Sequence, residues 1–170
     1  MIVLEAAQAL AWTWRHISAQ GGAPRRIVGA GHSAGGHLAA MLMPCHWGQL
    51  ARDLPPDLLR TGLSVSGLFD LLPIRRTPFL QADLRLDSDT ARRCSPARLP
   101  PPTAGRLLAV VGGDESPEFL RQNVLIHEHW GAARVPVCEA LAGLNHFSVL
   151  EALADPAHRL HAMALDALRG

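Results

Sequence analysis

The fold of this chain is indicated first by the stretch Arg26-Ile27-Val28-Gly29-Ala30-Gly31-His32-Ser33-Ala34-Gly35. Its first five residues are mostly apolar or small and include two β-branched side chains, which predicts a strand buried on both faces of a parallel sheet. The residues from Ala34 to Met43 are small and favour a helix. Ser33 is therefore expected where a strand turns sharply into a helix.

The glycines around this serine match the pattern Gly-x-Ser-x-Gly, which in the strand-to-helix context is typical of the nucleophile elbow of an α/β-hydrolase. A serine hydroxyl is a weak nucleophile unless a tight turn presents it beside a base and beside donors for the developing oxyanion. We expect Gly31 and Gly35 to be glycines because a side chain at either place would crowd the bend. The amide of Ala34 is expected to be one oxyanion donor. The alternatives are a turn that only packs and a turn that holds a phosphate, but the glycine spacing matches neither nucleotide-binding pattern.

The rest of the chain alternates predicted strands and helices, which favours βαβ units, right-handed crossovers and a mostly parallel sheet in one α/β domain over residues 1–170. Residues 73–102, rich in proline and charge, are expected to form a loop with at most one short helix. The other predicted elements are a helix at 4–20, strands at 61–66, 106–111 and 135–140, a helix at 117–130, and two final helices broken near Asp155-Pro156.

Composition excludes several classes of function. Of the 170 residues, 48% are hydrophobic, enough for one buried core, and the formal charge of +1 with interspersed signs argues against a nucleic-acid partner. Cys45, Cys94 and Cys138 are odd in number and widely spaced, which favours free thiols over disulfides or a zinc site. No apolar stretch reaches the roughly 18 residues of a membrane span. We therefore expect a cytoplasmic protein with no membrane partner.

Candidates for the catalytic base and acid follow from chain order, because the partners of the serine come as acid and then histidine, each after a later strand. Of the nine histidines, only His146 lies in a loop just after the last predicted strand. The acid is expected after the strand at 106–111, where Asp114 and Glu115 are adjacent and cannot be separated by spacing. Either of them could instead cap the helix that starts near Pro117.

A metal-dependent hydrolase is the weaker interpretation of the histidines. The pairs His127/His129 and His158/His161 lack the usual ligand spacing and a supporting acid. We therefore predict no metal and no cofactor.

The sequence resembles the kynurenine formamidase (arylformamidase) branch of the α/β-hydrolases, close to carboxylesterase-like members. The resemblance covers about residues 26–150, and its blocks occur in the family's order with similar separations. These blocks are Gly31–Ala39, Ser66–Leu71, Val111–Phe119 with Arg121-Gln122, and Asn145-His146-Phe147.

The resemblance implies roles for particular residues. In that family the acid directly precedes the Ser-Pro-Glu-Phe stretch, which favours Glu115 over Asp114, and the base is the histidine before phenylalanine, here His146. It also implies hydrolysis of N-formylkynurenine, or of small aryl and alkyl esters, through an acyl-enzyme on Ser33 without a cofactor. The expected partner is thus a small-molecule ester or amide.

One feature of the family is absent from this sequence. Members carry strands before the elbow and a His-Gly-Gly loop whose amides complete the oxyanion hole, and nothing before Ser33 resembles that loop. We therefore expect an N-terminally truncated hydrolase that is weakly active or poorly soluble, with a sheet edge that invites homo-oligomers or aggregation. The alternative function is a catalytically impaired fragment or a non-catalytic binding module.

Overall fold

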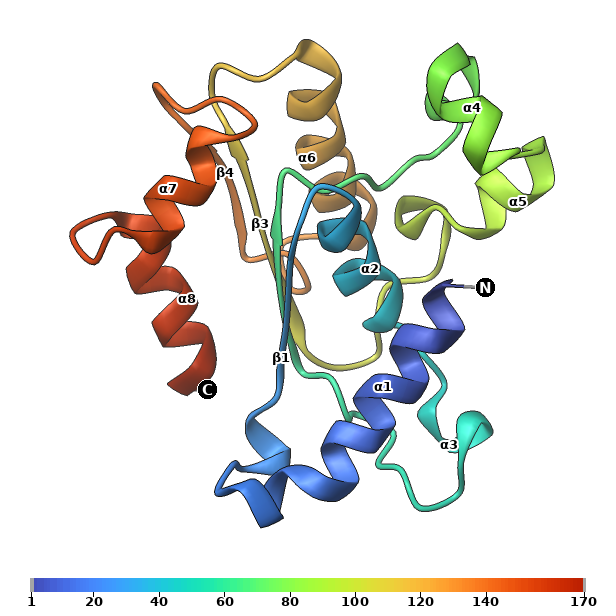
Figure 1. Cartoon of the computed structure of the whole chain (residues 1–170), viewed down its shortest axis with the longest axis vertical. Coiled ribbons are helices and arrows are strands. Elements are labelled where there is room, and N and C mark those ends of the chain that lie inside the picture. Colours follow the sequence, from blue (N-terminus) through green and yellow to red (C-terminus); the bar gives the residue numbers. More distant parts are fainter. Residues whose placement is uncertain (1, 170) are drawn as a thin grey trace.

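A parallel sheet forms the centre of the protein, and the computed structural model describes residues 2–169 (Figure 1). Its four strands lie in the order in which they occur along the chain, and each neighbouring pair is parallel. The strands are β1 (Val28–His32), β2 (Thr61–Val65), β3 (Arg106–Gly112) and β4 (Val137–Leu141). β1 and β4 therefore form the two edges, and β2 and β3 form the interior of the sheet.

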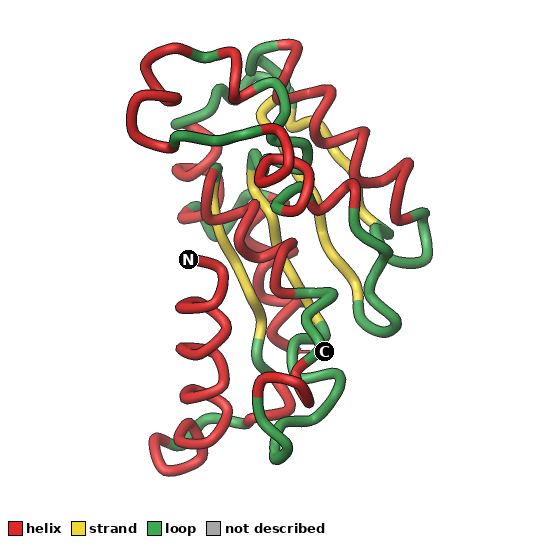
Figure 2. The backbone as a smooth tube through the Cα atoms, turned by 90° about the vertical axis from the view of Figure 1, so that its right-hand side faces the viewer, coloured by secondary structure: helices red, strands yellow, loops and turns green. Residues whose placement is uncertain are grey.

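Helices cover both faces of the sheet (Figures 1 and 2). α2 (Ala34–Leu42) packs on β1 and β2, α6 (Pro117–Trp130) packs on β3 and β4, and α1 (Ile2–His16) packs against α2. The opposite face carries α7 (Ser148–Ala154) and α8 (Arg159–Arg169), which contact β3 and β2 respectively. The remaining helices are α3 (Trp47–Leu50), α4 (Pro78–Leu84) and α5 (Ser88–Arg93), with 3-10 turns at Ile17–Gln20, Pro24–Arg26, Ile74–Arg76 and Pro96–Arg98.

The core is divided by the sheet, because successive side chains of a strand point to opposite faces. Along β3, Leu107 and Ala109 belong to the cluster beneath α1, α2 and α6, whereas Leu108 and Val110 belong to the cluster beneath α7 and α8. All of these side chains are buried. The continuous apolar run of β3 is thus explained by burial on both faces, as the sequence predicted.

The predicted strands and long helices are confirmed to within about two residues, except at the N-terminal helix, where a 3-10 turn replaces the α-helix after His16. The prediction for the first strand was wrong in two respects. The strand begins at Val28, not at Arg26, because residues 24–26 form a 3-10 turn. It is also only partly buried, with Ala30 exposed. The reason is its position at the edge of the sheet, which a local apolar run does not reveal.

Two other expectations also need correction. The segment 73–102 contains α4 and α5 rather than at most one short helix. The helix predicted from Ala34 to Met43 stops at Leu42, because Pro44 has no backbone N–H to continue it.

The three cysteines are free thiols, as expected. None of the described helices combines the length and the apolar character that crossing a membrane requires.

Candidate active site

The elbow lies at the carboxyl end of β1. Ser33 has φ 55° and ψ −117°, a conformation that non-glycine residues rarely adopt and that costs free energy unless its surroundings impose it. Two hydrogen bonds hold it: the Ser33 amide donates to the Val65 carbonyl at 2.9 Å, and the His37 amide donates to the Ser33 carbonyl at 3.1 Å. The serine is therefore locked between the strand β2 and the first turn of α2.

The glycines of the elbow differ in what they allow. A Cβ on Gly31 would lie 2.2 Å from the backbone carbonyl of Gly35, so that position requires glycine. A Cβ on Gly35 would meet nothing within 4 Å, so the expectation that a side chain there would crowd the bend was wrong. The close contact falls instead at Gly36, whose Cβ would lie 2.6 Å from Ser64 Oγ and 3.0 Å from Gly67 Cα. Gly36 thus lets α2 approach the sheet.

Ala34 is the first residue of α2 and is exposed. The first N–H groups of a helix have no acceptor within the helix and point outward from its N-terminus, where the dipole favours negative charge. The Ala34 amide therefore adjoins Ser33 at a position suited to an oxyanion donor.

The structure separates the two candidate acids. The Glu115 side chain is fully buried, and its Oε2 lies 2.6 Å from His146 Nδ1. Its other oxygen, Oε1, accepts a hydrogen bond from the Gly112 amide at 2.8 Å and another from the Ser66 hydroxyl. Asp114 is exposed, and its amide donates to the Leu144 carbonyl at 3.0 Å. Glu115 is therefore the carboxylate paired with the histidine.

His146 is packed between two other rings. The centroids of His32 and Phe119 lie 4.4 Å and 4.5 Å from the imidazole of His146, and His32 Nε2 is 2.8 Å from the His146 carbonyl oxygen. Burial, together with the neighbouring His146, lowers the pKa of His32, so His32 is neutral at pH 7 and donates Nε2–H to this carbonyl. His32, the residue before Ser33, thus ties the elbow to the loop that carries His146.

Ser33 and His146 lack the direct hydrogen bond that His146 and Glu115 share. Among the described residues, no hydrogen bond connects the Ser33 hydroxyl to the His146 imidazole. The elbow nevertheless lies beside this imidazole, since His32 contacts it. Nucleophile-to-base hydrogen bonds are often loose without a substrate and tighten when one binds.

Sequence reasoning did not assign roles to Ser66, Gly112 or Phe119, although all three lie in blocks that carry the family resemblance. Their contacts depend on the approach of β2, β3 and α6, which local pattern does not report. The only available signal was position: Ser66 and Gly112 each lie at the carboxyl end of a parallel strand, where functional side chains gather.

Gln122 joins the segment after β2 to α6. Its Oε1 accepts hydrogen bonds from the amides of Phe69 and Asp70, both at 2.7 Å, and its Nε2 donates to the Asp70 carbonyl at 2.8 Å. This side chain is completely buried and also bonds Glu118. Two of the resemblance blocks therefore meet in one hydrogen-bonded junction next to the site.

Three other histidines contact the backbone near them. The Nδ1 atoms of His127, His129 and His161 lie within hydrogen-bond distance of the carbonyl oxygens of Val135, Leu125 and Leu153, at 2.9, 3.0 and 3.0 Å. Within residues 2–169, no group of three or more His, Cys, Asp or Glu side chains is arranged to hold a metal ion.

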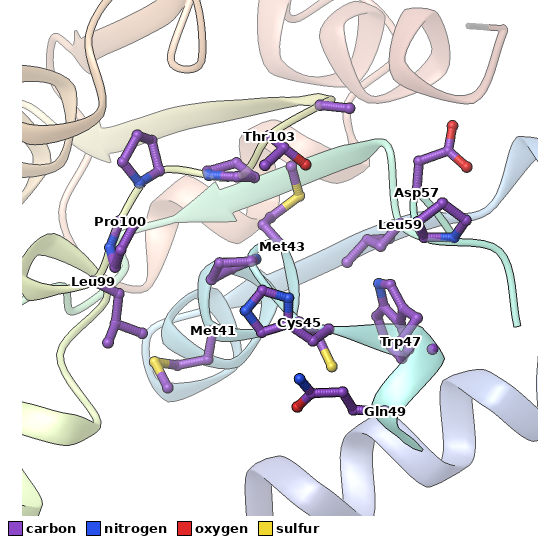
Figure 3. A pocket seen from close by; sticks show the side chains of 17 residues that line it. Met41, Met43, Cys45, Trp47, Gln49, Asp57, Leu59, Leu99, Pro100 and Thr103 are labelled. Atoms are coloured by element: carbon purple, nitrogen blue, oxygen red, sulfur yellow. The ribbon is translucent and has the colours of Figure 1, made fainter. Parts of the chain in front are cut away.

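A cavity of about 650 Å³, shown in Figure 3, has none of Ser33, Glu115 and His146 in its lining. It is lined by Trp47 and Leu59, by Met41 and Met43, and by the proline-rich run 99–104. These segments precede β2 and β3, so the cavity opens at the amino ends of the strands, opposite the elbow. It does not belong to the triad.

Comparison with known proteins agrees with this geometry. No protein-family model matches the chain. It is 34% identical over 141 residues to the kynurenine formamidase of Danio rerio, and 32% identical over 143 residues to that of Salmo salar. The chain is a homologue of kynurenine formamidases. Each alignment covers 79% of this homologue and 47% of the fish enzyme, so the chain spans about half the length of the curated relatives it matches.

Solved structures of other hydrolases share the fold of this chain. A candidate thioesterase from Silicibacter sp. TM1040 is 33% identical with a TM-score of 0.66, over 78% of this chain and 48% of that one. The carboxylesterase EstE1, from a metagenomic library, has a TM-score of 0.69 at 21% identity, over 98% and 61% of the two chains, and so supports the fold alone. The predicted resemblance and the α/β-hydrolase fold are both confirmed.

Proposed function

We propose that this formamidase homologue is a serine hydrolase of small amides and esters, with N-formylkynurenine-type formamides as the first substrate class. The observation that carries the proposal is the buried Glu115 carboxylate 2.6 Å from His146 Nδ1, beside a serine held at positive φ. The carboxylate holds the proton on Nδ1, which leaves Nε2 free to accept one from the nucleophile.

In the first half-reaction, Ser33 Oγ attacks the carbonyl carbon and its proton passes to His146 Nε2. The oxyanion that forms accepts a hydrogen bond from the Ala34 amide, and Glu115 stabilises the imidazolium. The carbon–nitrogen or carbon–oxygen bond then breaks, and His146 returns the proton to the leaving amine or alcohol. An acyl-enzyme remains on Ser33.

In the second half-reaction, water attacks the acyl carbon and gives a proton to His146. The bond to Ser33 Oγ breaks, the proton returns to the serine, and a carboxylic acid leaves. For a formamide substrate, this product is formate.

A second candidate is a non-catalytic or catalytically impaired α/β-hydrolase domain. One observation favours it: no hydrogen bond joins the Ser33 hydroxyl to the His146 imidazole in the described part of the chain.

Labelling with a fluorophosphonate probe separates the two candidates. A hydrolase should be labelled at Ser33, with the label absent from Ser33→Ala and strongly reduced in His146→Ala. An unlabelled wild-type chain that still unfolds cooperatively would support the non-catalytic candidate. Turnover of N-formylkynurenine against p-nitrophenyl acetate then tests the substrate class.

The acid can be tested with a matched pair of variants. Glu115→Gln keeps the shape of the side chain but removes its charge, and the labelling rate should fall by about 10²-fold to 10⁴-fold, as when the triad acid is neutralised elsewhere. Asp114→Asn should label at the wild-type rate. A larger loss in Asp114→Asn than in Glu115→Gln would overturn the assignment of Glu115.

A further inference from the structure

We propose that Ser66 is a positioning residue of this site, which holds the Glu115 carboxylate so that one of its oxygens faces His146. This inference rests on the proposed function, because it concerns the acid of the same triad. Ser66 would act through Glu115, which accepts the hydrogen bond of its hydroxyl.

The hydrogen bonds of Glu115 divide cleanly between its two oxygens. Oε1 accepts from both the Ser66 hydroxyl and the Gly112 amide, and Oε2 has His146 Nδ1 as its partner. Two donors on one oxygen fix the plane of the carboxylate, so that the other oxygen has a single orientation available. A glutamate has one more rotatable bond than an aspartate and needs this restraint more.

The carboxylate is also fully buried, with no exposed surface on its side chain. A buried anion is tolerated only when hydrogen bonds replace its lost hydration. The Ser66 hydroxyl is one of three such partners, so it helps to replace the hydration that the Glu115 carboxylate loses on burial.

The backbone conformation of Ser66 costs free energy, and the hydrogen bond to Glu115 explains why a serine is found there. Ser66 has φ 52°, its amide donates to the Val110 carbonyl at 2.7 Å, and only 1% of its surface is exposed. Glycine adopts positive φ without this cost. A serine at this position is therefore less favourable for the backbone than a glycine, but only the serine has a hydroxyl that can donate to Glu115.

Ser64 provides a matched control. It lies in β2, two residues before Ser66, is completely buried, and its Oγ has no hydrogen-bond partner within residues 2–169. Removal of an unpaired buried hydroxyl should not weaken the protein. Ser64→Ala and Ser66→Ala thus remove the same atom from neighbouring buried sites, of which only Ser66 bonds Glu115.

The experiment compares Ser66→Ala, Ser66→Gly and Ser64→Ala in two measurements. The first is steady-state hydrolysis of p-nitrophenyl acetate, in the wild type and in Glu115→Gln. The second is the low-field proton resonance of the His146 Nδ1–H, assigned by its absence in His146→Ala. Ser66→Gly keeps the proposal testable, because φ 52° suits glycine and the variant should unfold at the wild-type temperature.

We expect both Ser66 variants to lower kcat by about 10-fold to 100-fold, as is typical when a partner of a functional side chain is lost, with KM within twofold. The same variants in Glu115→Gln should cause no further loss, because Ser66 acts through the carboxylate. The His146 resonance should broaden or disappear in both, and Ser64→Ala should retain both signals.

Two results would overturn the proposal: an unchanged His146 resonance in Ser66→Gly, or a loss of kcat as large in the Glu115→Gln background as in the wild type. If the wild type neither hydrolyses nor labels, the proposed function fails, but the resonance still decides the role of Ser66. Its loss in the Ser66 variants alone would support positioning, and its retention would reject it.

Discussion

At the scale of single residues, the site concentrates unusual backbone geometry. Within residues 2–169, three non-glycine residues have positive φ, and two of them, Ser33 and Ser66, lie at the carboxyl ends of adjacent strands. Such conformations persist only where the surroundings impose them, and they gather at functional sites. Here the hydrogen bonds to Val65 and Val110 impose them. Neither angle follows from the identity of a serine.

The elbow glycines lead to a prediction about stability. Gly31→Ala should lower the free energy of unfolding by about 3 kcal/mol, because its Cβ would overlap the Gly35 backbone at 2.2 Å. Gly35→Ala should instead raise it by about 0.5–1 kcal/mol, because the position lies in α2 with open space around the added methyl group. Urea unfolding of both variants checks this. Equal destabilisation of the two would show that the elbow needs both glycines.

The same residues show what a motif can report. The pattern Gly-x-Ser-x-Gly located the nucleophile elbow, and the strand-to-helix context agreed with the structure. It did not distinguish the glycine that is sterically required, Gly31, from the one that is not, Gly35, because that depends on which backbone atoms approach each Cα.

At the scale of elements, α2 links the elbow to the segment between β2 and β3. His37 lies one turn after Ser33, and its Nε2 is 2.7 Å from the carbonyl oxygen of Cys94, the residue that ends α5. Burial lowers the pKa of His37 below its ordinary value of 6.5, and the hydrogen bond to Cys94 offsets this only in part. Burial therefore favours the neutral imidazole, whose Nε2–H donates to this carbonyl.

The burial of His37 should make stability depend on pH. Because the pKa of His37 is lower in the folded state, the unfolded chain binds more protons below about pH 6.5, and stability present above that pH is lost as the pH falls through it. His37→Gln retains a donor for Cys94 and removes the titration. The decrease in unfolding free energy between pH 7.5 and pH 5.5, measured with urea, should thus be smaller in His37→Gln. An identical decrease would mean that His37 does not contribute.

At the scale of the whole molecule, the sheet decides where the site forms. All four strands run in the same direction, so the residues that follow β1, β2, β3 and β4 all lie at the carboxyl end of the sheet. Ser33, Ser66, Glu115 and His146 come from these four positions, although 113 residues separate the first from the last in the numbering of the chain. The cavity of about 650 Å³ lies at the other end of the sheet, and none of these four residues lines it.

The sheet also predicts the order of local stability. Every residue of β2 is buried, as are six of the seven residues of β3, whereas β1 lies at an edge and is only partly buried. Hydrogen exchange should accordingly be slowest for the amides of β2 and β3 and clearly faster for β1. Mass spectrometry of peptides from the three strands measures this. Protection of β1 equal to that of β2 would indicate that its free edge is covered in solution.

Several features followed from the sequence alone, because they depend on neighbours along the chain. Apolar runs indicated the buried strands, small helix-favouring residues indicated the helix after Ser33, and the glycine pattern indicated the elbow. Chain order placed His146 after the last strand and narrowed the acid to two adjacent residues. The resemblance to kynurenine formamidases then favoured Glu115.

Only the tertiary structure decided the rest, because it depends on contacts between strands that are distant in sequence. It paired Glu115 rather than Asp114 with His146, by burying one carboxylate among three hydrogen-bond donors and leaving the other exposed. It brought Ser66 and Gly112 to the same carboxylate and placed β1 at the edge of the sheet. Local periodicity carries no information on which strands become neighbours, and hydrogen bonds across the sheet exist only once they do.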